Sequence, residues 1–272
     1  MIFCAGLTTS VNNQISVHLE SVVNSSFYTL LISIFLGLFI GSLVNYFADV
    51  LPATRRLSRP VCPECDQPYM PKDYLFSFRC PHCGNKRPKR HIIVLISSVI
   101  LCALLRFFPF HGLNFWATLP LLTYLGVIVV IDLEHRLVLL ETCLFGFLLM
   151  LIYGIIFHGI VKALSGALGG MLIMLALFLL GAAFGKIVGI LRHKAVNEVP
   201  FGFGDVIFGT ILGLLCGWPA IAAGLLLGIL IFSAYSLLWL ISLVLTKRYE
   251  SFSNAQALTP FLILGTIILF YL

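Results

Sequence analysis

Long apolar runs separated by short polar stretches dominate the pattern of this 272-residue chain. A helix needs roughly 20 consecutive apolar residues to cross the hydrocarbon core of a bilayer, which is about 30 Å thick. The sequence therefore predicts an all-α, polytopic membrane helix bundle. We expect about eight transmembrane helices, near residues 27–47, 92–110, 113–131, 137–158, 163–189, 206–218, 220–245 and 258–272. The sixth and eighth runs are short, which favours tilted or partly re-entrant helices.

The composition agrees with this pattern. Hydrophobic residues make up 60% of the chain and charged residues only 10%, whereas soluble proteins carry about 25% charged residues. The mean hydropathy of +1.06 is likewise that of a protein that lies in a lipid bilayer. Residues 1–26 lack a basic stretch followed by an apolar core, so we expect a short tail outside the membrane and no cleavable signal peptide.

Basic residues indicate the orientation of the helices, because Lys and Arg collect in the cytoplasmic loops of membrane proteins. If the N-terminus lies outside and eight helices alternate, all of the 17 Lys and Arg residues except Arg106 and Lys162 fall on the cytoplasmic side. This topology accounts for the net charge of +6 without a nucleic-acid partner.

Asp132 and Asp205 are the acids that this topology brings to attention. Each lies where a long apolar run meets a polar segment, and both connections fall on the cytoplasmic side at similar depth. An acid at the edge of a membrane helix is costly and usually has a function, although a solvated loop acid is the ordinary alternative for either one alone. Two carboxyl groups at one depth can share a proton and activate a water molecule, which is the chemistry of an aspartyl protease.

Gly202 and Gly204 flank a phenylalanine directly before Asp205. They let the backbone bend and approach another segment closely, and Asp205 then opens a helix, where the N-terminal dipole favours a carboxylate. A plain helix N-cap after a flexible turn is the alternative. The four-residue pattern GxGD is weak alone and gains weight from its position at the membrane boundary opposite Asp132.

Glu134 and Glu198 are the other acids near these positions. Glu134 follows Asp132 by two residues and so points to another face of the helix, while Glu198 lies in the polar loop before the glycine turn. A supporting role in substrate contact is one interpretation of both acids. Solvated loop residues are the more common interpretation of such acids.

Four cysteines form a second motif, in which two CxxC pairs are separated by fourteen residues. This spacing can bring four thiolates into the tetrahedral geometry of a structural zinc site, whereas two disulfides would be unusual on the cytoplasmic side. Four cysteines leave no open position for a water molecule, so we expect the zinc to organise a small cytoplasmic knuckle and not to catalyse a reaction. The expected ligands are Cys62, Cys65, Cys80 and Cys83.

Several segments of the chain resemble the bacterial prepilin leader peptidase / N-methyltransferase family of GxGD-type membrane aspartyl proteases. The segments are GSLVNYFADVLP at 41–52, IDLEHRLV at 131–138, GFGD at 202–205 and PFLILG at 260–265, and the cysteine loop is also similar. The resemblance runs from about residue 30 to the end of the sequence. It implies a multi-pass protein of the bacterial cytoplasmic (inner) membrane whose substrates are type IV prepilins or secretion pseudopilins.

The resemblance also implies roles for the two aspartates. Either Asp132 or Asp205 would be ionised and take a proton from water, while the other, protonated, would hydrogen-bond the scissile carbonyl and later protonate the leaving amine. It further divides the chain into a tail at 1–26, the first transmembrane helix with the cysteine loop at 27–91, and a membrane-embedded peptidase domain at 92–272.

N-methylation of the new N-terminus, with S-adenosylmethionine as the methyl donor, is implied by the resemblance alone. The chain has no glycine-rich strand-turn-helix pattern that would bind a nucleotide-like cofactor. Val50 stands where the family usually has Arg. The positions that match the family's methyltransferase region are Gly41, Ser42, Asn45 and Pro52.

Two other functions fit parts of the sequence. A proton-coupled transporter also needs acids in the membrane, but its acids are expected near the middle of helices, whereas Asp132 and Asp205 lie toward one face. A zinc-organised membrane scaffold would need only the cysteine loop, and it would tolerate the loss of both aspartates.

Overall fold

The computed structural model describes residues 3–62, 64–77, 79–110, 112–192, 202–246 and 256–271. Within these ranges the regular structure is helical, and the only β pairings are two isolated bridges that join Val61 to Pro68 and Arg79 to Lys86. The prediction of an all-α membrane protein is therefore confirmed.

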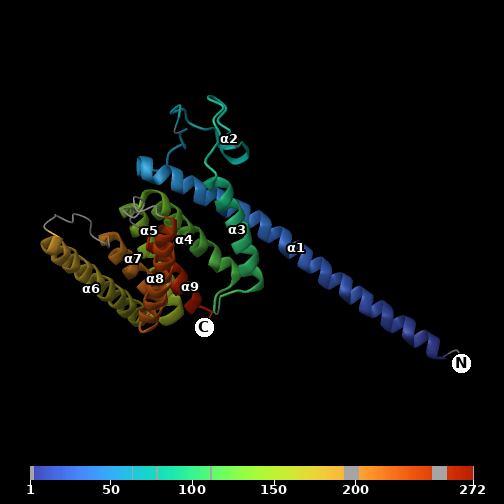
Figure 1. Cartoon of the computed structure of the whole chain (residues 1–272). Helices are drawn as coiled ribbons and strands as arrows, with labels where there is room; N and C mark the ends of the chain where they lie inside the picture. Colours follow the sequence, from blue (N-terminus) through green and yellow to red (C-terminus); the bar gives the residue numbers. More distant parts are fainter. Residues whose placement is uncertain are drawn as a thin grey trace.

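The helices follow one another along the chain as Figure 1 shows. Their bounds are α1 Phe3–Thr54, α2 Pro71–Phe76, α3 Arg90–Phe107, α4 Phe115–His135, α5 Leu140–His158, α6 Ile160–Arg192, α7 Phe203–Cys216, α8 Ala220–Thr246 and α9 Thr259–Leu269. Each predicted membrane run corresponds to one of these helices, and α2 is an additional short helix in the cysteine loop. Because α1 begins at Phe3, most of the segment 1–26 is helical and continuous with the first span.

Six of the described helices are long and apolar enough to cross a membrane, namely α1 from Tyr28 onward, α3, α4, α5, α6 and α8. Helix α7 has 14 residues and α9 has 11. At 1.5 Å per residue, both are too short to cross a core of about 30 Å without help from their neighbours. The chain is thus a multi-pass membrane protein. The two short apolar runs predicted from the sequence, 206–218 and 258–272, correspond to the short helices α7 and α9.

Helix α7 lies in the interior of the bundle, where it packs against α5, α6, α8 and α9. Its side chains Phe208, Leu212 and Leu214 are almost completely buried. A helix that is apolar on every face is stable when other helices surround it. The surrounding helices therefore bury α7 from Val206 onward, while Phe203 in its first turn stays exposed.

Glycines allow α6 and α7 to approach each other backbone to backbone. A side chain at Gly213 of α7 would collide with the carbonyl oxygen of Gly166, and one at Gly170 would collide with the carbonyl oxygen of Gly209. Small residues at such contacts give helices the close packing that holds them together in lipid. Gly185, farther along α6, has no atom within 4 Å of an added methyl group, so the close contact ends before it.

Helix α1 packs against α3 and α4. The hydroxyl of Ser98 in α3 donates a hydrogen bond to the carbonyl oxygen of Gly37 at 2.9 Å, and a side chain at Gly41 would collide with Ser98. On its other side, α1 brings Val44 against Gly126 of α4. The N-terminal part of α1 extends away from the other helices (Figure 1).

Several helix ends meet at one end of the bundle. The cysteine loop joins α1 to α3 there (Figure 1), and Arg90 at the start of α3 forms an ion pair with Glu134 at the end of α4. Thr259, the first residue of α9, interacts with Asp132 in the last turn of α4 and with Asp205 in the first turn of α7. The fold therefore collects the polar residues of four membrane helices in one place.

Candidate active site

Asp132 lies in the last turn of α4 and is only 8% exposed. The helix ends directly after it, because Arg136 adopts a left-handed conformation with φ of 51° and donates its backbone N–H to the carbonyl oxygen of Asp132 at 3.0 Å. A residue in this conformation stops a helix. The acid is thus held at the edge of an apolar helix, with its side chain among protein groups.

Asp205 lies in the first turn of α7 and is half-buried. The backbone N–H of Gly202 donates a hydrogen bond to Oδ2 of Asp205 at 3.2 Å. A carboxylate in this position also satisfies the free N–H groups at a helix start. The GxGD turn therefore fixes the carboxyl group of Asp205 as an N-terminal partner of its own helix.

The carboxyl groups of Asp132 and Asp205 lie near enough to each other for the charge of Asp132 to act on Asp205. Thr259 lies beside both of them and interacts with Asp132 through its backbone and its hydroxyl, and with Asp205 through its hydroxyl. Sequence reasoning did not identify Thr259. The available signal was a polar residue immediately before the PFLILG segment, at the start of an apolar run.

The two glycines of the turn differ in their surroundings. A side chain at Gly204 would collide with the Cβ and Cγ2 atoms of Val138, which lies in the connection between α4 and α5. A methyl group at Gly202 would come no closer to a neighbour than 3.8 Å, the distance to Oδ2 of Asp205. Gly204 is therefore the position at which the turn contacts the segment that follows Asp132.

Glu134 is bound by another residue. Its Oε2 atom accepts a hydrogen bond from the guanidinium group of Arg90, which also binds Asp49 of α1. Glu198 lies outside the described residues. The Asp49–Arg90–Glu134 ion-pair chain could not be predicted from the sequence, because its members are far apart along the chain.

The four cysteines lie together, and their sulfur atoms are all within 4.8 Å of one another. The Sγ atoms of Cys62 and Cys83 are 3.8 Å apart, and those of Cys65 and Cys80 are 3.7 Å apart. A tetrahedral metal with bonds to sulfur of about 2.3 Å separates its sulfur ligands by roughly 3.8 Å. The cluster can therefore hold a metal ion with all four ligand positions filled by cysteine.

The surroundings favour the thiolate form at two of the four cysteines. Burial opposes the charged form of Cys62, but the N–H of Glu64 and the hydroxyl of Tyr69 hydrogen-bond to its sulfur and lower the pKa of its thiol to about 6. The N–H of Cys83 likewise lowers the pKa of Cys80. At Cys65 the backbone N–H of Gln67 favours the thiolate, but burial and the other three sulfur atoms outweigh it and raise the pKa to about 12, and the pKa of Cys83 is raised as well. Because the thiolate is the form that binds metals, Cys62 and Cys80 are the cysteines best prepared for a cation.

Aromatic residues attach the cysteine loop to α1. The guanidinium group of Arg87 lies over the rings of Tyr69 and Tyr74, at 4.7 and 4.4 Å from their centroids. The hydroxyl of Tyr74 donates a hydrogen bond to Oδ2 of Asp49 at 2.6 Å. The loop is thus connected through Asp49 and Arg90 to the end of α4.

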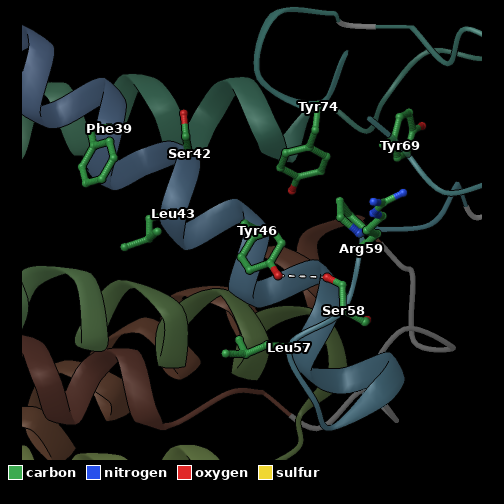
Figure 2. A pocket seen from close by; sticks show the side chains of 10 residues that line it. Phe39, Ser42, Leu43, Tyr46, Leu57, Ser58, Arg59, Tyr69 and Tyr74 are labelled. Atoms are coloured by element: carbon green, nitrogen blue, oxygen red, sulfur yellow. Dashed lines mark hydrogen bonds between the residues drawn. The ribbon is translucent and has the colours of Figure 1, made fainter. Parts of the chain in front are cut away.

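Two pockets lie along α1 beside this loop. Figure 2 shows the first, a pocket of about 510 Å³ to which α1 contributes Phe39, Ser42, Leu43 and Tyr46. The second, of about 490 Å³, is more polar, and the residues that line it include Asp49, Pro52, Glu64, Arg87, Arg90 and Glu134. Tyr69 and Tyr74 line both pockets.

The four positions expected to serve methyl transfer are not gathered in one site. Ser42 lines the first pocket and Pro52 lines the second. Gly41 packs against α3, and the side-chain amide of Asn45 is buried and donates a hydrogen bond to the carbonyl oxygen of His91 at 3.2 Å. Gly41 and Asn45 therefore hold α1 against α3.

A third pocket, of about 300 Å³, lies at the end of α4 and the start of α9. Leu133 and Arg136 line it from the end of α4, directly after Asp132, and Pro260 lines it from α9, directly after Thr259. The remaining lining residues are Tyr235, Trp239, Gln256, Ala257 and Phe261. This pocket combines aromatic walls with one cationic side chain.

Replacement of Gly204 by alanine is expected to lower the stability of the protein by about 1–3 kcal/mol, because the new methyl group overlaps Val138 and the packed connection must shift. Gly202→Ala is the matched control and should cost less than about 1 kcal/mol, the size of a changed helix cap. Thermal unfolding of the two variants in detergent measures the difference. Equal melting temperatures would contradict the close contact at Gly204.

Comparison with known proteins gives one match. Residues 119–238 match the type IV leader peptidase family. No curated protein and no solved structure matched the chain. The matched segment begins in α4 and ends in α8, so it contains Asp132, Asp205 and the GxGD turn but not α1 or the cysteine loop. The segment 119–238 is therefore similar to the type IV leader peptidase family.

Proposed function

We propose that this protein cleaves the leader peptide from type IV prepilins or pseudopilins, and that Asp132 and Asp205 activate the attacking water. The observation that carries the proposal is that Asp132 of α4 and Asp205 of α7 lie near each other at one end of an apolar helix bundle. The match of residues 119–238 to the leader peptidase family supports it. Prepilin-type substrates follow from that family.

The chemistry needs one proton between the two carboxyl groups. The ionised aspartate takes a proton from a water molecule as the water oxygen attacks the scissile carbonyl carbon, and the protonated aspartate gives its proton to the carbonyl oxygen. When the carbon–nitrogen bond of the tetrahedral intermediate breaks, the leaving amine receives the proton taken from water. A hydroxyl of the intermediate returns a proton to the other aspartate as the new carboxyl group forms, so the pair again holds one proton. The two aspartates act as a coupled pair, so their protonation belongs to the pair and not to either residue.

The distribution of basic residues supports a cytoplasmic location for this site. The cysteine loop carries a cluster of Lys and Arg residues, and it lies at the same end of the bundle as the carboxyl pair. Arg106, at the far end of α3, belongs to the opposite face. Because basic loops remain in the cytoplasm, the site would meet a leader peptide that emerges on that side.

We infer that the substrate binds in the pocket at the end of α4 and the start of α9. Its aromatic residues Tyr235, Trp239 and Phe261 suit a large apolar side chain from the beginning of the substrate helix. Arg136 adds a positive charge that suits an acidic group of the substrate.

Asn substitution of either Asp132 or Asp205 is expected to lower prepilin cleavage by about 10²–10⁴-fold or more, because an amide can neither accept nor supply the required proton. The measurement is cleavage of a prepilin substrate by purified full-length variants. Glu141→Gln, which changes an exposed acid in the first turn of α5, is the matched control and should cleave normally. Cleavage at the wild-type rate by either Asn variant would exclude the two-aspartate mechanism.

The metal that we propose for the cysteine cluster is zinc in a structural role. Four thiols at tetrahedral separations fit a closed zinc site, which has no position for a reacting water. Cys62, Cys65, Cys80 and Cys83 would hold the ion, and the folded loop would then present Tyr69 and Tyr74 to α1.

Metal analysis of the purified protein should therefore find about one zinc ion per chain. Cys65→Ser removes a ligand and should lower the zinc content at least several-fold. His82→Ala changes an exposed residue of the same loop and should leave the zinc content unchanged. Equal zinc contents in the two variants would show that the cysteines are not the ligands.

N-methylation of the cleaved substrate is a second candidate function, and the polar pocket of about 490 Å³ favours it. S-adenosylmethionine would supply the methyl group. Its cationic centres suit the carboxylates of Asp49 and Glu134, its carboxylate suits Arg87, and its adenine ring suits the tyrosines that line the pocket. The size of the pocket is also in the range of small-molecule sites.

Asp49→Asn is expected to weaken binding of S-adenosylmethionine by about tenfold or more, because it removes a carboxylate from the polar pocket. Phe39→Leu, which changes only the neighbouring apolar pocket, should bind normally. Calorimetric titration measures binding, and mass spectrometry of the cleaved peptide measures methylation. If the wild-type protein binds no S-adenosylmethionine, the methyltransferase proposal is wrong while the peptidase proposal stands.

A further inference from the structure

Thr259 is the first residue of α9 and is only 1% exposed. It precedes Pro260, so it stands at the point where the apolar helix begins. Helix α9 packs against α4, α7 and α8. The side chain of Thr259 is thus enclosed by α4 and α7, which carry the two acids, and by α8.

The hydroxyl of Thr259 lies near both carboxyl groups. It interacts with Asp132 and with Asp205, and the backbone of Thr259 also interacts with Asp132. Yet Oγ1 of Thr259 and Oδ2 of Asp132 are both buried without a well-aligned hydrogen-bond partner among the described residues. A buried polar atom that lacks a partner is costly and calls for an explanation.

A hydroxyl has properties that suit such a position. It donates one hydrogen bond and accepts two, so it can donate to an ionised carboxylate and accept from a protonated carboxyl group. It can donate to only one carboxylate at a time. The acid that receives this hydrogen bond is the one whose charge is stabilised.

We propose that Thr259 is a positioning residue whose hydroxyl bridges Asp132 and Asp205 and determines which of them is ionised before water attacks. The proposal rests on the proposed peptidase function and adds a third group to the pair. Thr259 does not exchange a proton with the substrate. It acts by keeping one carboxyl group ionised and the other protonated.

The other charged and polar groups near the carboxyl pair each act on one of the two acids or line the neighbouring pocket. Arg136, at the end of α4, acts by charge on Asp132, and the N–H of Gly202 binds Asp205 from the turn before α7. Tyr235 of α8 lines the pocket that Arg136 and Pro260 also line. Among the described residues that interact with the carboxyl groups, Thr259 is the one that acts on both.

A purely structural role for Thr259 makes a different prediction. Valine has nearly the shape of threonine and would fill the same buried space without a polar atom. If Thr259 only packs α9 against its neighbours, valine should serve as well or better. If the hydroxyl bridges the acids, valine should preserve folding and damage the reaction.

Thr266 provides a matched control on the same helix. It is 2% exposed, and its hydroxyl donates to the carbonyl oxygen of Ile263 at 2.8 Å, as is usual for threonine inside a helix. Thr266→Val therefore makes the same chemical change in a similarly buried place that the carboxyl pair does not touch.

The experiment compares full-length Thr259→Val, Thr259→Ser and Thr266→Val with the wild type, using cleavage of a synthetic prepilin peptide over a range of pH. Thr259→Val should lower kcat by about tenfold or more, with a smaller change in KM, and should shift the pH profile of kcat. Thr259→Ser retains the hydroxyl and should restore both the rate and the profile. Thr266→Val should match the wild type.

Two results would overturn the proposal: a Thr259→Val enzyme with the wild-type kcat and pH profile, or a Thr259→Ser enzyme as impaired as the valine variant. Should the valine variant not fold in detergent, Thr259→Ala takes its place in the comparison with serine. The Asn variants of Asp132 and Asp205 are run in the same assay. If these still cleave, the peptidase proposal fails, whereas normal cleavage by Thr259→Val alone refutes only the role of the hydroxyl.

Discussion

The placement of two acidic side chains beside each other in an apolar helix bundle is the constraint on which the rest of the fold depends. A carboxyl group in the interior of a bilayer is costly, so both acids lie at helix ends, one in the last turn of α4 and one in the first turn of α7. The end of α4 is fixed by the left-handed Arg136. The start of α7 is fixed by the GxGD turn, which needs the absence of a side chain at Gly204 to fit against Val138.

The sequence predicted those features that depend on local pattern. Apolar runs identified the helices, cysteine spacing identified the cluster, and alternation of the helices across the membrane placed Asp132 and Asp205 on one side. What it missed depends on contacts between distant segments. The Asp49–Arg90–Glu134 chain unites three helices, and no local pattern indicates that Arg90 binds Glu134. Thr259 looked like an ordinary threonine at the start of an apolar run.

The cysteine loop and the carboxyl pair are physically connected although their chemistry differs. From Cys62, a path of contacts runs through Tyr69 and Arg87 to Tyr74. It continues through Asp49 and Arg90 to Glu134, two residues beyond Asp132. The loop therefore braces the last turn of α4 from outside the membrane. This arrangement explains how a metal-binding loop outside the matched family segment can matter to residues inside it.

The shortness of α7 determines how deep in the membrane its acid lies. The far end of α7 is held near the opposite face, where the N–H of Trp218 donates a hydrogen bond to the carbonyl oxygen of Lys162 at 3.2 Å. A helix of 14 residues measures roughly 21 Å, about 9 Å less than the thickness of the hydrocarbon core. The start of α7, with Asp205, therefore falls short of the other side of a hydrocarbon core of that thickness. For the proposed peptidase, a substrate helix would present its terminal peptide bond at that depth while most of its length stays in lipid.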